Sequence, residues 1–179
     1  MEEMFDVYDE NGKYLGVKPK SFCHSENPGV YHKPVWVWIV NSKNEILIQK
    51  RAETKKFMPN KWDSSATGHV SAGESSLQGC VREIFEEIGI LFDEKDLNFI
   101  GEFPAPEVWE FGQVYLLNAD ISLDKIKLQD GEVSEVKWIN FDEFKQLFMS
   151  DDFMPYGENY KNWICEILEK EMEKQSQPE

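Results

Sequence analysis

One segment of this 179-residue chain, residues 68–90, combines a helical repeat of apolar residues with a dense cluster of acids. An apolar stripe expected to pack on a core is formed by Leu77, Val81, Ile84, Phe85 and Ile88. At about 100° per residue, Glu83, Glu86 and Glu87 fall within roughly one quadrant on the opposite, surface-facing side. The segment therefore predicts an amphipathic helix that presents three carboxylates on one face.

The ends of this helix are also marked. Ser75 with Gln78 three residues later has the pattern of a capping box, and Gly89 stands where a left-handed residue would end the helix. Carboxylates three and four residues apart repel each other unless a cation neutralises them. Mg²⁺ or Mn²⁺ suits such hard oxygen ligands, together with water and substrate phosphate oxygens. A solvated acidic helix face is the alternative that the fragment alone leaves open.

The spacing of the whole segment resembles the Nudix box of the Nudix hydrolase superfamily. That pattern is Gly, five residues, Glu, seven residues, Arg-Glu, an aliphatic, one residue, Glu-Glu, one residue, Gly and an aliphatic. The matching residues are Gly68, Glu74, Arg82, Glu83, Ile84, Glu86, Glu87, Gly89 and Ile90. Nine specified positions without a mismatch make this a specific motif.

The resemblance implies metal-dependent attack of water on a diphosphate linked to another group. It assigns metal ligation to Glu83, Glu86 and Glu87, includes Gly68 in the metal-binding set, and gives Arg82 the task of orienting the glutamates. It also implies an α+β fold, the Nudix-type α/β/α sandwich with a mixed β-sheet, for residues 1–179 as a single domain.

Patterning along the chain agrees with that architecture. We expect an amino-terminal hairpin at about 3–18, a central pair of strands at 35–40 and 45–50, and later strands near 98–103, 109–119 and 133–139. Asn140 is placed to cap a helix over 141–148, and residues 156–174 are expected to form a long carboxy-terminal helix.

A narrower resemblance covers most of the chain: the run ILIQKRAETKKFMPNKWDSSATGHVSAGES, preceded by YHKPVWVWI, is similar to the branch that includes type I isopentenyl-diphosphate isomerase. That enzyme uses a cysteine before the Gly-His of the box and a downstream glutamate. Here the first position holds Thr67, and the counterpart of the second is Gln113. A threonine has no accessible thiolate, and a glutamine cannot exchange a proton as a carboxyl group does. Isomerase activity is therefore disfavoured.

Histidines bind metal in the isomerase branch, and His32 and His69 fall at such positions. Neutral imidazole suits Mn, Zn or Fe. A second divalent metal at these histidines and ordinary hydrogen-bonded histidines stand as alternatives. The third histidine, His24, has the weakest match in spacing.

Residues outside the box are candidates for the remaining tasks. Arg51 and Lys55 are expected to bind the diphosphate, and exposed basic residues without that role are the alternative. Glu132, before the strand ending at Trp138, is the candidate general base, with Glu110 and Glu107 as alternatives.

The net charge and the cysteine content limit the classes of partner and the cellular compartment that we expect. With 19 Lys and Arg against 34 Asp and Glu, the net charge is −15, which disfavours binding to polymeric nucleic acid. The three cysteines show no metal-finger spacing or paired framework, the first residues are acidic, and no apolar run reaches the length of a membrane span. We therefore expect a cytoplasmic protein with a small-molecule diphosphate as its partner and no membrane; a homodimer is left open.

The sequence thus predicts a Nudix hydrolase that cleaves a phosphoanhydride bond in a small-molecule diphosphate derivative, with a nucleoside diphosphate derivative as the expected class and Mg²⁺ or Mn²⁺ as its cofactor. Two alternatives remain: an isomerase of the isopentenyl-diphosphate type, and a ligand-binding module that keeps the fold without turnover.

Overall fold

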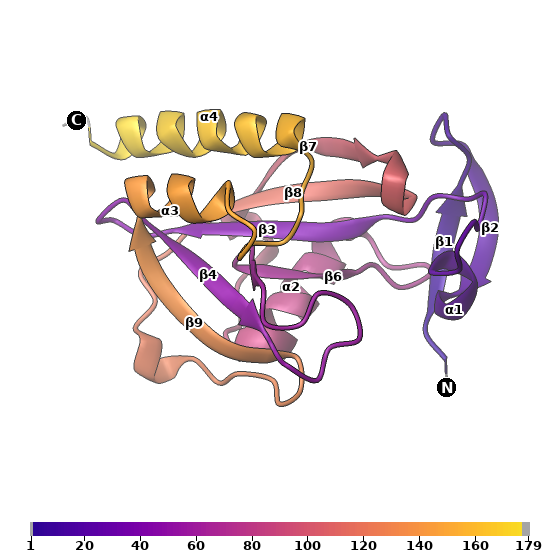
Figure 1. Cartoon of the computed structure of the whole chain (residues 1–179), viewed down its shortest axis with the longest axis horizontal. Helices are drawn as coiled ribbons and strands as arrows, with labels where there is room; N and C mark the ends of the chain where they lie inside the picture. Colours follow the sequence, from indigo (N-terminus) through magenta and orange to yellow (C-terminus); the bar gives the residue numbers. More distant parts are fainter. Residues whose placement is uncertain (1, 177–179) are drawn as a thin grey trace.

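The computed structural model describes residues 2–176 and consists of a small amino-terminal hairpin beside a larger mixed sheet covered by helices on both faces (Figure 1). The two-stranded hairpin is followed by a seven-stranded sheet. The strands are β1 (Met4–Tyr8), β2 (Tyr14–Pro19), β3 (Pro34–Val40), β4 (Glu45–Arg51), β5 (Trp62–Asp63), β6 (Ala66–His69), β7 (Leu97–Ala105), β8 (Glu110–Asn118) and β9 (Val133–Asn140). The α-helices are α1 (Lys20–Cys23), α2 (Ser76–Ile88), α3 (Phe141–Phe148) and α4 (Glu158–Gln175), with 3₁₀ turns at Glu94–Asp96, Pro106–Val108 and Leu123–Lys125.

The centre of the sheet is β3, which pairs with β4, β6 and β8. All of its seven residues are buried, as expected for a strand covered on both faces. The β3–β8 pair is parallel and the other pairs are antiparallel, so the sheet is mixed. The expected central strand pair is confirmed, although β3 and β4 share only a short ladder near Ile39 and Val40.

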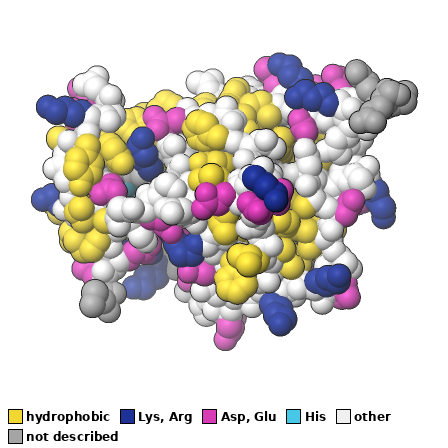
Figure 2. Space-filling view, turned by 180° about the vertical axis from the view of Figure 1, so that it is seen from behind, with side chains coloured by type: hydrophobic (Ala, Val, Ile, Leu, Met, Phe, Trp, Pro, Cys, Tyr) yellow, Lys and Arg dark blue, Asp and Glu magenta, His cyan; other side chains and the backbone are white. Residues whose placement is uncertain are grey.

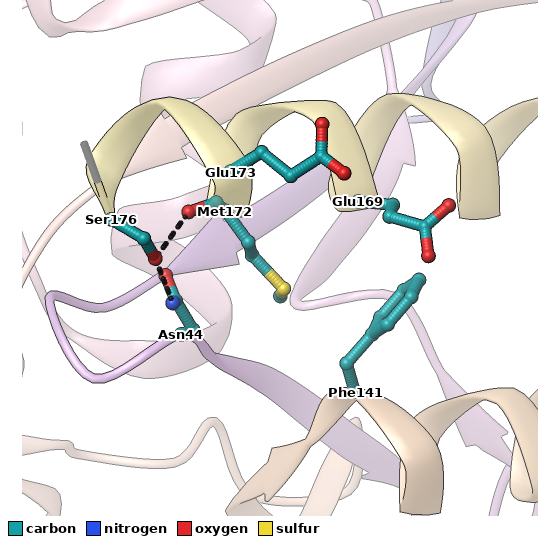
Figure 3. A pocket seen from close by; sticks show the side chains of 6 residues that line it. All are labelled: Asn44, Phe141, Glu169, Met172, Glu173 and Ser176. Carbon is teal, nitrogen blue, oxygen red and sulfur yellow. Dashed lines mark hydrogen bonds between the residues drawn. The ribbon is translucent and has the colours of Figure 1, made fainter.

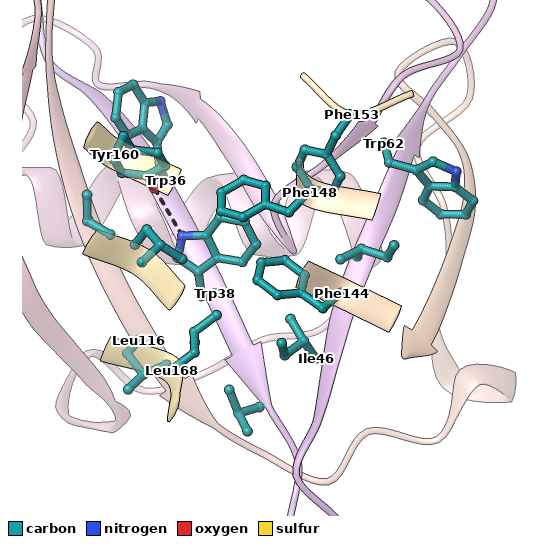
Figure 4. Close-up of a cluster of buried hydrophobic side chains, with 14 of the residues drawn as sticks. Trp36, Trp38, Ile46, Trp62, Leu116, Phe144, Phe148, Phe153, Tyr160 and Leu168 are labelled. Atoms are coloured by element: carbon teal, nitrogen blue, oxygen red, sulfur yellow. Dashed lines mark hydrogen bonds between the residues drawn. The ribbon is translucent and has the colours of Figure 1, made fainter. Parts of the chain in front are cut away.

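Successive side chains of β3 point to opposite faces of the sheet, and each set builds its own core. Val35, Val37 and Ile39 pack with α2 residues. On the other face, Trp36 and Trp38 pack against α3 and α4 (Figure 4). The α/β/α sandwich is therefore confirmed, and it rests on the period-two alternation of one strand.

The aromatic core beneath α3 and α4 also contains a buried hydrogen bond. The Trp38 Nε1–H donates to the Tyr160 hydroxyl at 3.0 Å, and the Trp38 ring meets Phe144 and Phe148 edge to face (Figure 4). A buried indole N–H requires a hydrogen-bond acceptor, and here the acceptor lies on α4. The bond therefore connects α4 to β3 at the centre of the sheet.

Helix ends follow the sequence signals closely. Ser75 and Gln78 form the expected capping box, Gly89 is left-handed with φ of 72°, and Asn140 caps α3. The long carboxy-terminal helix starts two residues later than predicted, at Glu158, after Gly157 as its N-cap.

One residue of the predicted apolar stripe was placed wrongly. Phe85 is 52% exposed, whereas Ile84 and Ile88 are fully buried against the sheet. At 100° per residue Phe85 shares the outer side of α2 with Glu86, so the stripe is narrower than the composition of the segment suggests.

The hairpin has a small core of its own, and it lies at one end of the large sheet (Figure 1). Phe5 and Val7 of β1 are buried with Cys23 of α1. The backbone of Tyr8 exchanges two hydrogen bonds with Tyr31, and Ala72 N donates to Met4 O. These contacts attach the hairpin beside the start of β3 and the loop that precedes α2.

Candidate active site

A cleft of about 1320 Å³ runs between the hairpin, the loop before α2, the 52–61 loop and the α3–α4 connection. It collects most of the residues predicted from the sequence. Those that line it are Arg51, Lys55, Gly68, His69, Arg82, Glu83, Glu86, Glu87, Glu107, Glu110 and Glu132. His32 is 1% exposed and lies behind the wall, next to His69. The predicted residues therefore converge, although they come from six separate segments.

Glu83 lies directly against the loop that leads into the helix. Its Oε1 accepts a hydrogen bond from the His69 N–H at 3.1 Å. A Cβ at Gly68 would stand only 2.0 Å from the Glu83 carboxyl carbon. Glycine is needed at position 68 because the carboxylate occupies the space that any side chain would take.

Arg82 holds the acidic residues of the box together. Its Nε and NH2 groups donate to both oxygens of Glu74 at 2.9 and 2.8 Å, and NH1 donates to Glu83 at 2.8 Å and Glu86 at 3.3 Å. NH2 also donates to the His69 carbonyl oxygen. A planar guanidinium can make this set of bonds and an ammonium group cannot. The geometry agrees with the orienting role that the motif implies for Arg82.

Glu87 is buried, contrary to the expectation of a surface-facing carboxylate. It is 7% exposed, and its Oε2 accepts hydrogen bonds from Gln49 Nε2 and Thr67 N, both at 2.9 Å. Position 87 is one turn after Glu83 and next to Ile88, so its side chain turns toward β4 and β6. Its hydrogen bonds to separate strands make it part of the packing between α2 and the sheet.

Burial perturbs both of these glutamates. It raises the pKa of Glu83 to about 7, against the opposing effect of Arg82. It raises the pKa of Glu87 to about 8, against the hydrogen bonds from Thr67 and Gln49. Two desolvated carboxyl groups beside an exposed third one, Glu86, form a site in which negative charge is costly without a cation.

The donor set fits a hard divalent ion. Within residues 2–176, hydrogen bonds engage one carboxylate oxygen each of Glu83, Glu86 and Glu87, and the second oxygen of each is left for another ligand. Carboxylate oxygens are the ligands that Mg²⁺ and Mn²⁺ prefer. The residues present could therefore hold such an ion at the wall of the cleft.

All three histidines of the chain meet beside this acidic group. The ligating atoms of His24, His32 and His69 lie within 4.8 Å of one another, and the Nε2 atoms of His24 and His69 are 3.1 Å apart. Among residues 2–176, both ring nitrogens of buried His32 lack a hydrogen-bond partner, and its Nε2 lies 3.4 Å from Glu110 Oε1. Unpartnered buried nitrogens are uncommon, and here they lie beside groups of a kind that can ligate a metal.

The hairpin packs against two members of the histidine cluster, buried His32 and half-buried His69, whereas His24 is exposed at the cleft. The Phe5 ring stacks on His32 and His69 at centroid distances of 5.1 and 4.8 Å. Burial lowers the pKa of His24, and it lowers the pKa of His69 well below its usual value. Neutral imidazole is the form that binds metals. From the sequence, His24 is the weakest candidate for a metal ligand because its spacing to His32 fits the isomerase branch poorly. It joins the cluster because the hairpin and α1 dock against the sheet.

The predicted phosphate-binding residues also line the cleft and already have partners within the protein. Lys55 forms an ion pair with Glu132. Arg51 donates from Nε to Met58 O, from NH2 to Phe57 O and from NH1 to Asp63 Oδ2. Three of the five guanidinium N–H groups are thus used within residues 2–176, which leaves two for a ligand.

The positions that distinguish an isomerase lie on strands beside β3. Thr67 pairs with Trp36 and Gln113 with Val35, so both flank the same part of the central strand. Gln113 is 6% exposed, and its Nε2 donates to Glu102 and to Phe111 O. An amide in this position acts as a donor and has no carboxyl proton to transfer.

A second, smaller pocket of about 420 Å³ lies at the end of α4, away from these groups (Figure 3). Glu169 and Glu173 face it, and Asn44 donates to Ser176 across it at 3.0 Å. None of the residues predicted to act on a diphosphate lines this pocket. Its lining contains no basic side chain that could bind a phosphate.

Acidic, basic and hydrophobic side chains are interspersed on the face seen in Figure 2. Exposed hydrophobic residues of the molecule include Phe85, Leu91 and Phe99. Among the helices described for residues 2–176, none combines the length and apolar character that crossing a bilayer requires.

Sequence comparisons place this cleft in a known family. Residues 30–157 match the NUDIX domain family. An uncharacterised Nudix hydrolase of Listeria monocytogenes is 34% identical over 87% of this chain and 90% of its own length. Nudix hydrolase 3 of Arabidopsis thaliana is 36% identical over 88% of this chain, which spans only 22% of the plant protein. The isopentenyl-diphosphate Delta-isomerase of Pectobacterium atrosepticum is 31% identical, covering 80% of this chain and 79% of the isomerase.

Solved structures share the fold. A protein of Deinococcus radiodurans superposes with a TM-score of 0.72 at 20% identity, over 94% of this chain and 98% of that one. A bifunctional NMN adenylyltransferase/ADP ribose pyrophosphatase of Francisella tularensis, complexed with AMP and a Mn ion, gives a TM-score of 0.59 at 22% identity, over 79% and 42% of the two chains. With a matching domain, a box complete at every specified position and relatives of both kinds, the chain belongs to the Nudix hydrolase family, in the branch that also contains isopentenyl-diphosphate isomerases.

Proposed function

We propose that this protein is a divalent-metal-dependent hydrolase that cleaves a phosphoanhydride bond in a small nucleoside diphosphate derivative by attack of water. The observation that carries the proposal is the arrangement of Glu83, Glu86 and Glu87 on one wall of the cleft, each with a carboxylate oxygen left for a ligand. The relative from Francisella tularensis, whose structure contains AMP and Mn, supports the nucleoside part of the proposal.

Mg²⁺ or Mn²⁺ is the proposed cofactor, held by Glu83, Glu86 and Glu87 next to Gly68 and His69. When bound, such an ion neutralises phosphate oxygens and lowers the pKa of coordinated water. The protein groups supply the rest. Arg82 orients the glutamates, and Gly68 leaves the space in which the Glu83 carboxylate lies.

Arg51 and Lys55 are proposed to bind the diphosphate, and Glu132 is proposed as the general base. All three line the cleft, and Lys55 pairs with Glu132. A phosphate bound to Lys55 would compete for that ion pair and free a Glu132 oxygen to accept a proton from water. Glu110 and Glu107, which also line the cleft, are the alternatives for this role.

A second divalent ion is proposed at His32 and His69, with His24 completing the set. The convergence of three imidazoles, two of them with lowered pKa, and the two unpartnered nitrogens of His32 support this site. Nitrogen ligands favour Mn, Zn or Fe over Mg.

Isomerase activity is the second candidate because relatives of that activity cover most of the chain. It is disfavoured here by Thr67, whose backbone N–H bonds Glu87, and by the amide of Gln113. A non-catalytic binding module is the third candidate. The net charge of −15 disfavours polymeric nucleic acid for any of the three.

The three candidates are separated by incubating the protein with Mg²⁺ or Mn²⁺ and a panel of nucleoside diphosphates, nucleotide sugars, dinucleotides and isopentenyl diphosphate. Release of phosphate or of a nucleoside monophosphate is expected. An allylic product would support the isomerase instead, and tight binding without any product would support the module.

Glu86→Gln is the matched variant for this assay. Glu86 is a largely exposed member of the cluster, so its loss should leave folding intact while turnover falls by at least 100-fold, since a metal ligand is removed. Wild-type turnover by this variant at saturating Mg²⁺ would reject the proposed metal site.

A further inference from the structure

Asp63 is a buried carboxylate at the cleft to which neither the box nor the proposed chemistry assigns a task. It is 1% exposed, at the end of the short strand β5, and it lines the cleft. Its Oδ1 accepts hydrogen bonds from the Tyr156 hydroxyl at 2.6 Å and from Ser64 N at 2.8 Å. Its Oδ2 accepts from Arg51 NH1 at 3.3 Å. A buried charge persists only where such partners compensate it.

On one side Asp63 acts on Arg51, which in turn holds the loop between β4 and β5. We refer to residues 52–61 as the basic loop, since they include Lys55, Lys56 and Lys61. Arg51 donates to the carbonyl oxygens of Phe57 at 3.0 Å and Met58 at 3.1 Å, at the tip of this loop. The Arg51 side chain therefore links the backbone of the basic loop at Phe57 and Met58 to the Asp63 carboxylate.

The conformation that Arg51 maintains is strained. Met58 and Asn60 have φ of 47° and 61°, in the left-handed region that residues other than glycine seldom adopt. Strain of this kind persists only where the surrounding structure compensates it. Here the compensation consists of the two carbonyl contacts from the Arg51 guanidinium and a backbone bond from Asn60 N to Arg51 O at 3.2 Å.

On its other side Asp63 is tied to the α3–α4 connection, which also lines the cleft. Tyr156, which belongs to this connection, supplies the hydroxyl that orients the carboxylate. Trp62 N donates to Asp152 O, and Met154 N donates to Trp62 O, both at 2.8 Å. The connection and β5 are therefore one hydrogen-bonded unit, against which the basic loop is braced.

We propose that Asp63 is a positioning residue for diphosphate binding: it fixes the Arg51 guanidinium, so that the two N–H groups left over and the neighbouring Lys55 are presented to the phosphates in a preformed arrangement. The inference rests on the proposed function and adds a residue that acts through Arg51. Preformed donors bind phosphate more tightly because less freedom is lost on binding.

The test measures binding of methylenediphosphonate, a diphosphate that cannot be hydrolysed, to the whole protein in the presence of Mg²⁺ by calorimetry. Asp63→Asn keeps an oxygen for Tyr156 and Ser64 but turns an amide N–H toward Arg51. Its Kd should rise about tenfold, the usual size of one lost charge-assisted contact. Tryptic cleavage after Lys55 and Lys56 should also be faster.

Coupling to Arg51 distinguishes positioning from a general loss of structure. In an Arg51→Lys background the same Asp63→Asn change should alter Kd less than twofold, because the contact that it removes is already absent. Equal effects in both backgrounds would overturn the proposal. Asn140→Ala, which removes the N-cap of α3 away from the cleft, is the control and should not change Kd.

Two further results complete the test. If the wild-type protein does not bind methylenediphosphonate, the proposed function fails, whereas wild-type affinity retained in Asp63→Asn rejects the positioning role alone. If Asp63→Asn does not fold, Tyr156→Phe removes the hydroxyl that orients the carboxylate and should raise Kd two- to fivefold. An unchanged Kd in that variant would overturn the proposal.

Discussion

Glu87 differs from the other two box glutamates in that it serves the packing of α2 as well as the proposed metal site. Its carboxylate sits between Gln49 of β4 and Thr67 of β6, and burial raises its pKa to about 8 from a usual value of 4.5. In the metal-free protein a proton therefore stabilises the folded state more than the unfolded one. The contribution of this proton to the stability of the folded protein is fully present below pH 4.5 and is lost as the pH rises through 8.

Glu87→Gln should therefore stabilise the metal-free protein at high pH. Glutamine keeps an oxygen for the bonds from Gln49 and Thr67 and cannot ionise. At pH 9 in EDTA its free energy of unfolding should exceed that of the wild type by about 1–3 kcal/mol, and at pH 5 the difference should shrink toward zero. Chemical denaturation at both pH values measures it.

Glu86→Gln is the control for this experiment because it changes an exposed carboxylate of the same helix. A pH-independent difference between Glu87→Gln and the wild type would contradict the prediction. With Mg²⁺ present, both variants should lose turnover.

The hairpin is the element that completes the histidine cluster. Without β1 there would be no Phe5 ring against His32 and His69, and His24 would not be held near them by α1 and its following turn. The hairpin core contains few residues, so each one matters for its docking.

Phe5→Ala should loosen this element and weaken the histidine site selectively. Truncating a buried phenylalanine costs about 3–5 kcal/mol, here mostly in the stability of the hairpin. Amide hydrogen exchange over residues 4–19 should accelerate, and Co²⁺ affinity, followed by absorption of the bound ion, should fall at least tenfold. Val17→Ala, at an exposed position of β2, is the control and should bind Co²⁺ as the wild type does. Unchanged Co²⁺ affinity in Phe5→Ala would contradict a metal site at the histidines.

In the molecule as a whole, apolar burial on both faces of the sheet offsets the electrostatic repulsion within an acidic chain. The two cores on either side of β3 provide the apolar burial, while the net charge of −15 opposes compaction. Neutralisation of the box carboxylates by a divalent ion should therefore be visible in global stability.

Adding Mg²⁺ at tenfold above its Kd should raise the melting temperature by about 3–6 °C, since binding to the folded state alone contributes about 1.4 kcal/mol. NaCl of equal ionic strength separates this effect from general screening. A shift of the same size with NaCl alone, or a full Mg²⁺ shift in Glu83→Gln, would argue against ion binding at the box. Differential scanning calorimetry provides the measurement.

Local patterns in the sequence predicted the elements well. The α2 and α3 helices begin directly after their predicted N-caps, because a capping box depends on side chains three residues apart, and α2 ends at the predicted Gly89. The β-rich run from Val35 to Val40 indicated the central strand, and the complete box identified Glu83, Glu86 and Arg82, which form ion pairs. These features depend on contacts between near neighbours in the chain.

Which of those groups are buried, and which partners they contact, depends on residues far apart in the chain. Glu87 meets Gln49 across 38 residues, His24 meets His69 across 45, and Asp63 meets Tyr156 across 93. Helical spacing places a carboxylate on a face, but desolvation and orientation come from strands and loops brought there by the packing of the sheet. The order of residues along α2 is thus enough to specify which chemical groups the helix carries, whereas the packing of distant strands and loops sets how those groups are buried, oriented and connected to the rest of the cleft.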